Sequence, residues 1–295
     1  MSLILPTIGF SLISASILAL AAVGFTLQFG VTNILNLAFA EVMTSSAFVA
    51  YWVNSRGISI WIGMLVAGLF GAILSLLINR WLYRPFIRSG TRLFGLIIVS
   101  MGLALIIQNG VLAITGPGFF TYDQPHGLAF DVAGIRFTYT ELAILLIAVV
   151  AMAAVHLLLT RTRLGKAMRA CSADSALARC SGVPTARVVD IAWLLSGALA
   201  GIAGVTLFMN TTAFSVTTSG DFLVVIIAAA ILGGVGDAYG AMLGALIIGF
   251  ATEFSALFLN SAYKTAIAFV ILVVVLLIRP QGVRAAFAAA REVQT

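Results

Sequence analysis

Three polar side chains interrupt a long apolar stretch near the start of the chain. Asn33 and Asn36 both lie in the element N-I-L-N-L-A, and Glu41 follows shortly after it. Amide and carboxylate groups are costly in apolar surroundings, so all three should face the protein interior. The asparagines then either line and gate a polar pathway or hydrogen-bond neighbouring helices. Glu41 also belongs to this candidate pathway set, although we favour a structural role for it, such as capping a broken helix.

A glycine-rich element, G-G-V-G-D-A-Y-G, occupies residues 233–240. Its spacing differs from the G-x-G-x-x-G of a dinucleotide site, and no strand-like segment precedes it. Gly236, Gly240 and Gly244 recur every four residues, which also suits close helix packing. We favour a functional break in a helix, with packing beyond it, over packing alone. The residues predicted to form this break are Gly233, Gly234, Gly236 and Asp237.

The polar connection at residues 161–187 is long and basic, and it is rich in helix formers from Ser172 to Cys180. Ser172 would cap such a helix, and Gly182 would end it, with Pro184 beyond. A motor subunit could grip a short helix of this kind. The alternative is an ordinary basic loop that binds anionic lipid.

Other chemistry is disfavoured by the residues present. The G-K-A run at 165–167 lacks the Ser or Thr and the upstream glycine of a phosphate-binding loop, so the chain should not hydrolyse ATP itself. Cys171 and Cys180 alone make no metal site, and His126 and His156 are isolated. We therefore expect no metal, no cofactor and no enzymatic activity.

The composition places these elements in a membrane. Of 295 residues, 62% are hydrophobic and only 9% are charged, and the mean hydropathy is +1.15. A water-facing surface normally needs roughly a quarter charged residues. The apolar runs are too long, and alternate too little, for barrel strands. The sequence predicts an all-α, polytopic transmembrane helix bundle in one domain, residues 1–295, with two broken or re-entrant segments.

Six uninterrupted spans and two interrupted regions follow from the apolar pattern. The spans are predicted at about 8–28, 60–79, 93–114, 140–160, 188–208 and 265–279. The interrupted regions are 27–51 and 222–259. Polar or glycine-rich backbone at membrane depth requires surrounding protein or a water-filled cavity. One such region near each end of a chain is the usual indication of a transport site between two structural repeats.

The distribution of charge predicts the topology. Three clusters, within 80–92, 161–187 and 279–291, hold 13 of the 16 basic residues. The positive-inside rule places all three in the cytoplasm, whereas residues 115–139, with few basic residues, belong outside. We expect an external N-terminus and a cytoplasmic C-terminus. The net charge of +6 then reflects topology and contact with lipid, and we expect no nucleic-acid partner.

Four elements together resemble the permeases of bacterial ABC importers of the branched-chain amino acid type. They are N-I-L-N-L-A at 33–38, the loop at 164–183, I-L-G-G-V-G-D-A-Y-G-A at 231–241, and R-P-Q-G at 279–282. Their order and spacing are specific, and the resemblance covers nearly the whole chain. It implies a bacterial inner-membrane permease subunit that imports branched-chain or other amino acids.

The resemblance also implies partners and residue roles. The partners are ABC ATPase subunits, a second, paralogous permease and an extracytoplasmic solute-binding protein. The loop would be the segment that docks on the ATPase. The residues that inherit this coupling role are Gly165, Arg169, Ala170, Asp174, Ala178 and Gly182.

Departures from the family pattern leave the substrate open. Phe39 and Ala40 stand where a histidine and a glycine are usual, and Asp237 replaces a common serine. Relatives that carry urea or short amides provide one alternative. Another is a secondary carrier without an ATPase, which would need ionisable residues at membrane depth. Only Asp237 and Glu253 are candidates for that role.

Overall fold

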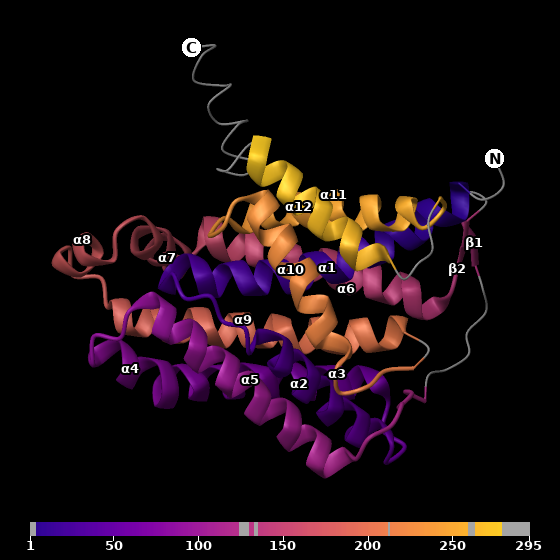
Figure 1. Ribbon diagram of the computed structural model, residues 1–295, viewed down its shortest axis with the longest axis horizontal. Coiled ribbons are helices and arrows are strands. Elements are labelled where there is room, and N and C mark those ends of the chain that lie inside the picture. The colour runs from indigo at the N-terminus through magenta and orange to yellow at the C-terminus, as the bar shows by residue number, and fades with distance from the viewer. Residues whose placement is uncertain (1–3, 124–129, 133–134, 212, 259–262, 279–295) are drawn as a thin grey trace.

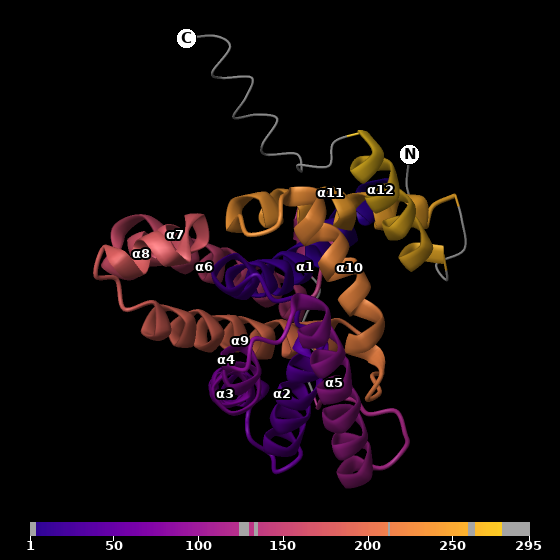
Figure 2. The same cartoon turned by 60° about the vertical axis from the view of Figure 1, so that its left-hand side comes forward.

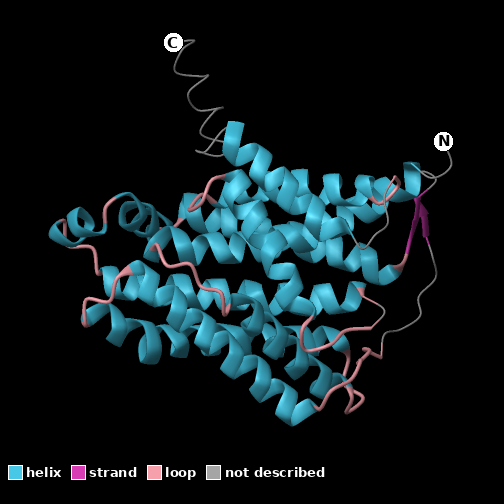
Figure 3. Cartoon of the chain, in the orientation of Figure 1, coloured by secondary structure: helices cyan, strands magenta, loops and turns pink. Residues whose placement is uncertain are grey.

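The computed structural model describes residues 4–123, 130–132, 135–211, 213–258 and 263–278 (Figure 1). Apart from one short hairpin, the regular structure in these ranges is helical (Figure 3). The helices are α1 Ile4–Thr32, α2 Phe39–Asn54, α3 Ile60–Leu77, the π-helix η1 Ile78–Tyr83, α4 Arg84–Arg88, α5 Leu93–Thr115, α6 Tyr139–Arg161, α7 Arg163–Ala173, α8 Ser175–Cys180, α9 Thr185–Asn210, α10 Thr218–Gly233, α11 Ala238–Ser255 and α12 Lys264–Ile278. The antiparallel hairpin pairs β1 Phe130–Val132 with β2 Ile135–Phe137.

In the described residues, six helices are long and apolar enough to cross a membrane. Five of them confirm predicted spans: α1, the continuous helix formed by α3, η1 and α4, α5, α6 and α9. The sixth is α11, which lies within the second interrupted region. The span predicted at 265–279 corresponds to α12, which has only 15 residues. Both interrupted regions are indeed broken, at residues 33–38 and 234–237.

The long helices run roughly along the same axis, so the molecule has two distinct ends (Figure 1). We call the end that carries α7 and α8 the coupling end, and the end that carries β1 and β2 the hairpin end. Helices α1 and α9 pack against each other at the centre. In Figure 2, α2, α3 and α5 lie on one side of this pair, and α11 and α12 lie on the other.

Burial differs sharply between helices. Residues 39–48 of α2 are all buried, because α2 is surrounded by α3, α5, α9 and α10. By contrast, only Leu96, Ser100 and Val111 are buried in α5. The exposed side of α5 is apolar, as expected of a surface that faces lipid or another membrane-embedded chain.

Small residues allow α3 and α9 to pack closely. A Cβ at Gly71 on α3 would collide with the carbonyl oxygen of Gly197 on α9, and a Cβ at Gly201 would collide with that of Ala67. Without a hydrophobic effect between helices in lipid, such close backbone contact is a main source of association. These glycines therefore join α9 to α3 along its length.

Candidate functional site

The first interruption begins where α1 ends. Asn33 has a φ of 53°, and it is the one non-glycine residue with positive φ among the residues described. Its N–H donates to the carbonyl oxygen of Phe29 at 2.7 Å, which is a typical helix C-terminal arrangement. The prediction that Asn33 faces the interior is wrong, because its side chain is exposed. The residue tolerates this backbone conformation better than most and terminates the helix.

Asn36, in contrast, is buried and joins a hydrogen-bond network between helices. Its Oδ1 accepts from the Tyr83 hydroxyl at 2.9 Å and from the Ala38 N–H at 3.1 Å. Its Nδ2 donates to Oε1 of Gln28 at 3.5 Å, and the Ser196 hydroxyl donates to the same Oε1 at 3.2 Å. The Ala38 N–H determines the orientation of the Asn36 amide. Nδ2 of Asn36 and the Ser196 hydroxyl both bond Oε1 of Gln28, and Nε2 of Gln28 is buried without a hydrogen-bond partner.

Glu41 lies in the first turn of α2 and is only 4% exposed. Its Oε1 is 3.7 Å from the position that a Cβ of Gly220 would occupy, so the carboxylate lies against the first turn of α10. No side-chain hydrogen bond caps α2, and Oε2 of Glu41 has no partner. The expected capping role is thus not what the geometry shows.

The second interruption is a tight turn between α10 and α11. Gly234 and Gly236 have φ values of 104° and 93°, which side-chain-bearing residues rarely adopt. Asp237 then caps α11, since its Oδ1 accepts from the N–H of Tyr239 at 3.1 Å. The predicted break is therefore present, and the polar residue within it has a structural partner.

The neighbouring glycines serve packing. A Cβ on either Gly233 or Gly240 would collide with the carbonyl oxygen of the other, and one on Gly244 would collide with that of Ala229. These contacts hold α11 directly against α10. A break with packing beyond it is thus present, and packing alone is wrong: Gly234 and Gly236 form the turn, and Gly240 and Gly244 form the helix contact.

The coupling loop contains two helices where the sequence predicted one. Thr162 caps α7 by accepting from the N–H of Gly165 at 3.0 Å. Asp174, which is extended, separates α7 from α8 and caps α8 by accepting from the N–H groups of Ala176 and Leu177 at 2.8 and 3.0 Å. The prediction that Ser172 is the cap is wrong. Asp174 is the better acceptor because its carboxylate reaches two donors.

The other residues that were predicted to couple to an ATPase have definite positions in this pair of helices. Gly165 has no room for a Cβ against the carbonyl oxygens of Leu158 and Leu159, so α7 folds tightly back on α6. Ala178 is buried, and the carbonyl oxygen of Ala170 accepts from the N–H of Asp174 at 3.1 Å. Gly182 follows α8 with a φ of 81°, as predicted for a helix end.

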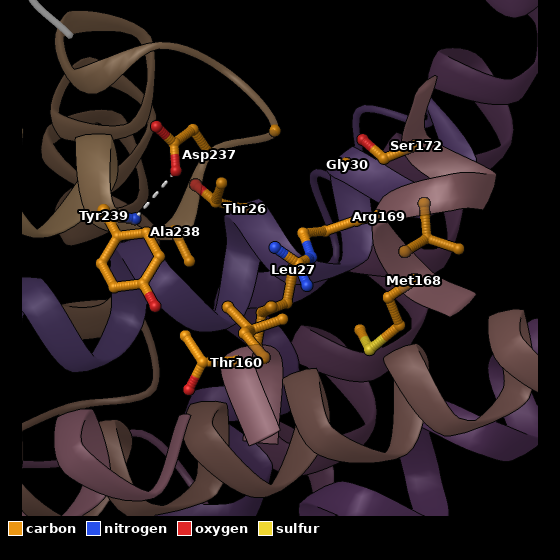
Figure 4. Close-up of a pocket in the computed structure, with 13 residues that line it drawn as sticks. Thr26, Leu27, Gly30, Thr160, Met168, Arg169, Ser172, Asp237, Ala238 and Tyr239 are labelled. Atoms are coloured by element: carbon orange, nitrogen blue, oxygen red, sulfur yellow. Dashed lines mark hydrogen bonds between the residues drawn. The ribbon is translucent and has the colours of Figure 1, made fainter. Parts of the chain in front are cut away.

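One cavity joins the coupling loop to the glycine turn (Figure 4). It has a volume of about 190 Å³, and Arg169 of α7 lies on one side of it. Gly236 and Asp237 of the turn lie on another side, and Thr26 and Gly30 of α1 complete the wall. Two residue sets that were predicted separately, for coupling and for the pathway, therefore meet around the same space.

Helix α1 touches the turn directly at this cavity. A Cβ on Gly30 would lie 2.9 Å from the carbonyl oxygen of Gly236 and 3.0 Å from its Cα. Asn33 follows one turn later along α1. The two interruptions are therefore neighbours through the end of α1.

Sequence reasoning missed an ion-pair network at the coupling end. Oδ1 of Asp190, on α9, accepts from Asn79 at 2.8 Å and from Arg84 at 2.6 Å. Its Oδ2 accepts from Nε and Nη2 of Arg80 at 3.1 and 2.9 Å. Together, the side chains of Asn79, Arg80 and Arg84 connect η1 and α4 to α9 through these bonds. The sequence did contain a signal for this network. Asp190 lies in an otherwise apolar predicted helix, and Arg80 and Arg84 are four residues apart, on one face of another helix.

Aromatic rings close the hairpin end. We call the residues concerned the aromatic cap: Phe48, Tyr51, Phe120, Tyr122, Phe208 and Phe214. Phe208 and Phe214 stack with centroids 4.2 Å apart, and Phe48 meets Phe120 edge-on at 5.3 Å. Phe120 and Phe214 also exchange backbone hydrogen bonds of 2.8 and 3.0 Å, which join the loop after α5 to the loop before α10.

The arrangement of long, partly interrupted helices has a counterpart among solved structures. A structure described as an inward-facing conformation of a metal-chelate type ABC transporter matches with a TM-score of 0.50 at 17% sequence identity. The match covers 91% of this chain and 85% of that one. The fold of this chain is therefore similar to that of the transporter chain.

Sequence comparison gives the family. A family model described as "Branched-chain amino acid transport system / permease component" matches residues 7–276. The high-affinity branched-chain amino acid transport system permease protein BraD of Pseudomonas aeruginosa is 31% identical over 287 residues. The corresponding protein LivH of Escherichia coli is 30% identical over 280 residues, and each match covers 90% of both chains. The chain belongs to this family of transport permeases.

Proposed function

We propose that this permease imports branched-chain or other amino acids across a bacterial inner membrane, driven by ATP hydrolysis on partner subunits. The observation that carries the mechanism is the shared cavity between α7 and the glycine turn. A displacement of α7 by an ATPase would act on Gly236 and Asp237, and through Gly30 on the end of α1. The substrate class rests on the names of the relatives.

The proposed topology places the coupling end in the cytoplasm. Arg80, Arg84 and Arg88 lie on η1 and α4, and the basic residues of α7 and α8 lie at the same end (Figure 1). The positive-inside rule favours this orientation, with the N-terminus outside and the C-terminus inside. The basic cluster within 279–291 and the C-terminus lie outside the described residues.

The ATPase would dock on the coupling loop. The residues proposed for this contact remain Gly165, Arg169, Ala170, Asp174, Ala178 and Gly182. A second, open cavity of about 990 Å³ adjoins the loop, and four arginines line it: Arg84, Arg88, Arg179 and Arg187. Such a basic surface suits acidic side chains on a partner. The permease itself would be non-catalytic.

A solute-binding protein would dock at the hairpin end. Its proposed contacts are the loops at 116–136 and 210–221, of which residues 124–129, 133–134 and 212 lie outside the described part. The paired backbones of Phe120 and Phe214 support this proposal, because they make the two loops one surface. A second, paralogous permease would complete the pathway, and the exposed apolar side of α5 offers area for it as well as for lipid.

The pathway residues remain those suggested by the two interruptions: Asn33, Asn36, Glu41, Gly233, Gly234, Gly236 and Asp237. Burial of Asn36 and Glu41 supports an internal role for this pair. Asn33 follows the exposed end of α1, so its position fits the entrance of the pathway better than the narrowest part of the pathway.

The two rival functions are less well supported. Of the carboxylates considered for ion coupling, Asp237 caps α11, and Glu253 bonds Lys264 and Ser14, both at 2.8 Å. Neither is in a position to bind and release a coupling ion freely, which disfavours a secondary carrier. Import of urea or short amides remains the alternative substrate class, because Phe39 and Ala40 depart from the usual pattern.

Reconstitution tests the proposal directly. The chain would be co-expressed with its ATPases and second permease, and assembled in liposomes with the binding protein. We expect ATP-dependent uptake of radiolabelled leucine and little uptake of urea. Uptake of urea but not leucine would reject the substrate class. Uptake of leucine without any ATPase would reject the mechanism.

A further inference from the structure

Glu41 differs from Asp190 and Glu253 in having a buried oxygen without a partner. Asp190 bonds three side chains, and Glu253 bonds a lysine and a serine. Oε2 of Glu41 is buried with no hydrogen-bond partner, and the carboxylate faces the first turn of α10. An isolated buried carboxylate is costly unless a charge or donor reaches it. Its position therefore suits a group that brings a positive charge or a hydrogen-bond donor.

A second unpartnered group lies in the same turn of α10. Ser219 is fully buried, its hydroxyl has no partner, and it precedes Gly220, the residue against which the Glu41 carboxylate lies. The N-terminal turn of a helix carries partial positive charge, which favours an anion beside it. The junction of α2 and α10 thus presents a buried carboxylate and a buried hydroxyl at a helix N-terminus, whose first turn also carries the exposed Asp221.

The aromatic cap lies on the hairpin side of this junction. Phe48 follows Glu41 by seven residues on α2, so both side chains lie on the same face of the helix, about 10 Å apart along its axis. Phe214, which packs on Phe48 at 5.6 Å, is only four residues before the start of α10. The segment that carries Phe214 therefore leads directly into the first turn of α10, which covers Glu41.

We infer that Glu41 binds the ammonium group of the transported amino acid. The inference rests on the proposed function and identifies the group that the pathway recognises. In the present conformation, the first turn of α10 covers the carboxylate, and the aromatic cap packs on the hairpin side of it. Movement of Phe214 on docking of the binding protein would withdraw this turn and expose Glu41 and Ser219. The Ser219 hydroxyl would donate a hydrogen bond to the carboxylate of the same solute.

A purely structural role for Glu41 would require permanent partners for its carboxylate. A structural carboxylate at a helix junction would bond N–H groups or a cation, as Asp237 and Glu253 do. Glu41 has neither in the described structure. A transport residue must instead release its ligand, so a site without a permanent partner fits transport better.

The test uses the complete reconstituted transporter with saturating leucine-loaded binding protein. Glu41→Gln keeps the shape of the side chain and removes its charge. We expect its maximal rate of leucine uptake to fall at least about tenfold, as loss of a charge-assisted bond predicts. KM for the loaded binding protein, the basal ATPase rate and the unfolding temperature should stay near wild type. Glu41→Asp should restore part of the rate.

Glu253→Gln is the matched control, because Glu253 is another largely buried carboxylate but has partners. It should lower the unfolding temperature while uptake per folded transporter is largely kept. Wild-type leucine uptake in Glu41→Gln would overturn the inference and leave the proposed function intact. So would equal losses in Glu41→Asp and Glu41→Gln, or a loss that follows unfolding in both the Glu41 and Glu253 variants. Failure of the wild type to import leucine would reject the proposed substrate, and the ammonium site with it.

Discussion

The backbones of Gly30 and Gly236 meet without side chains between them, at the point where α1 passes the turn that joins α10 to α11. Gly236 needs its glycine for a φ of 93°, whereas Gly30 lies within a regular helix and needs its glycine only for this approach. A substitution at Gly30 therefore tests the close contact with Gly236 alone, because it does not change a backbone position with positive φ.

Gly30→Ala should push α1 away from the turn. The added Cβ would lie 2.9 Å from a carbonyl oxygen, and overpacking of this kind costs about 1–3 kcal/mol. We expect a lower unfolding temperature in detergent and reduced uptake. Gly110→Ala is the control, because this helical glycine of α5 has open space where a Cβ would be added. It should be neutral or stabilising by up to about 1 kcal/mol. Equal behaviour of the two variants would contradict close packing at Gly30.

Removal of Asp190 should loosen the coupling end. Asp190→Ala leaves Arg80, Arg84 and Asn79 without their common acceptor. The arginines are 51% and 29% exposed and can be hydrated, so we expect a loss of about 1–3 kcal/mol in the free energy of unfolding. Arg80→Ala should cost less, since Arg84 and Asn79 keep their bonds. An Arg80→Ala effect as large as that of Asp190→Ala would show that the network is not centred on the aspartate.

The cap of α8 can be tested by a pair of substitutions. Asp174→Ala removes the acceptor for two N–H groups and should destabilise α8 by about 0.5–2 kcal/mol, whereas Asp174→Asn keeps a good cap. We expect fewer solutes transported per ATP hydrolysed in Asp174→Ala and near-normal coupling in Asp174→Asn. ATPase binding should persist in both. Normal coupling in the alanine variant would mean that α8 need not be helical.

Thiol labelling tests the proposed topology. Cys180 is exposed at the coupling end, whereas Cys171 is buried. Burial raises the pKa of the Cys171 thiol, so less reactive thiolate is present at neutral pH and its labelling should speed up only at higher pH. In intact cells, an impermeant maleimide should leave Cys180 unlabelled and label Phe119→Cys, an 82% exposed position near the hairpin end. Permeabilised cells should label Cys180. Labelling of Cys180 in intact cells would reverse the topology.

Sequence reasoning was most successful where a local rule decides the structure. Long apolar runs gave five of the six spans, and glycine-rich or polar interruptions marked both breaks. Gly182 was correctly predicted to end a helix because only its own backbone preference is involved. These features need no knowledge of tertiary neighbours.

The errors concern residues whose environment is set by distant segments. Asn33 and Asn36 are chemically alike, but one ends α1 at the surface and the other meets Tyr83, which lies 47 residues away. Asp190 and its arginines are more than 100 residues apart. Ser172 was predicted as the cap because propensity alone did not reveal that Asp174 is extended and separates α7 from α8. Such pairings depend on which helices pack together, and periodicity does not specify this.

The length of α9 has a mechanical consequence. Its 26 residues extend about 39 Å, from the residue after the coupling loop to the residue before the Phe214 loop. A single continuous helix therefore connects the two ends of the molecule, with the Asp190 network close to one end and Phe208 of the aromatic cap close to the other. A displacement of the first turn of α9 would therefore be transmitted along one helix to Phe208 and the aromatic cap.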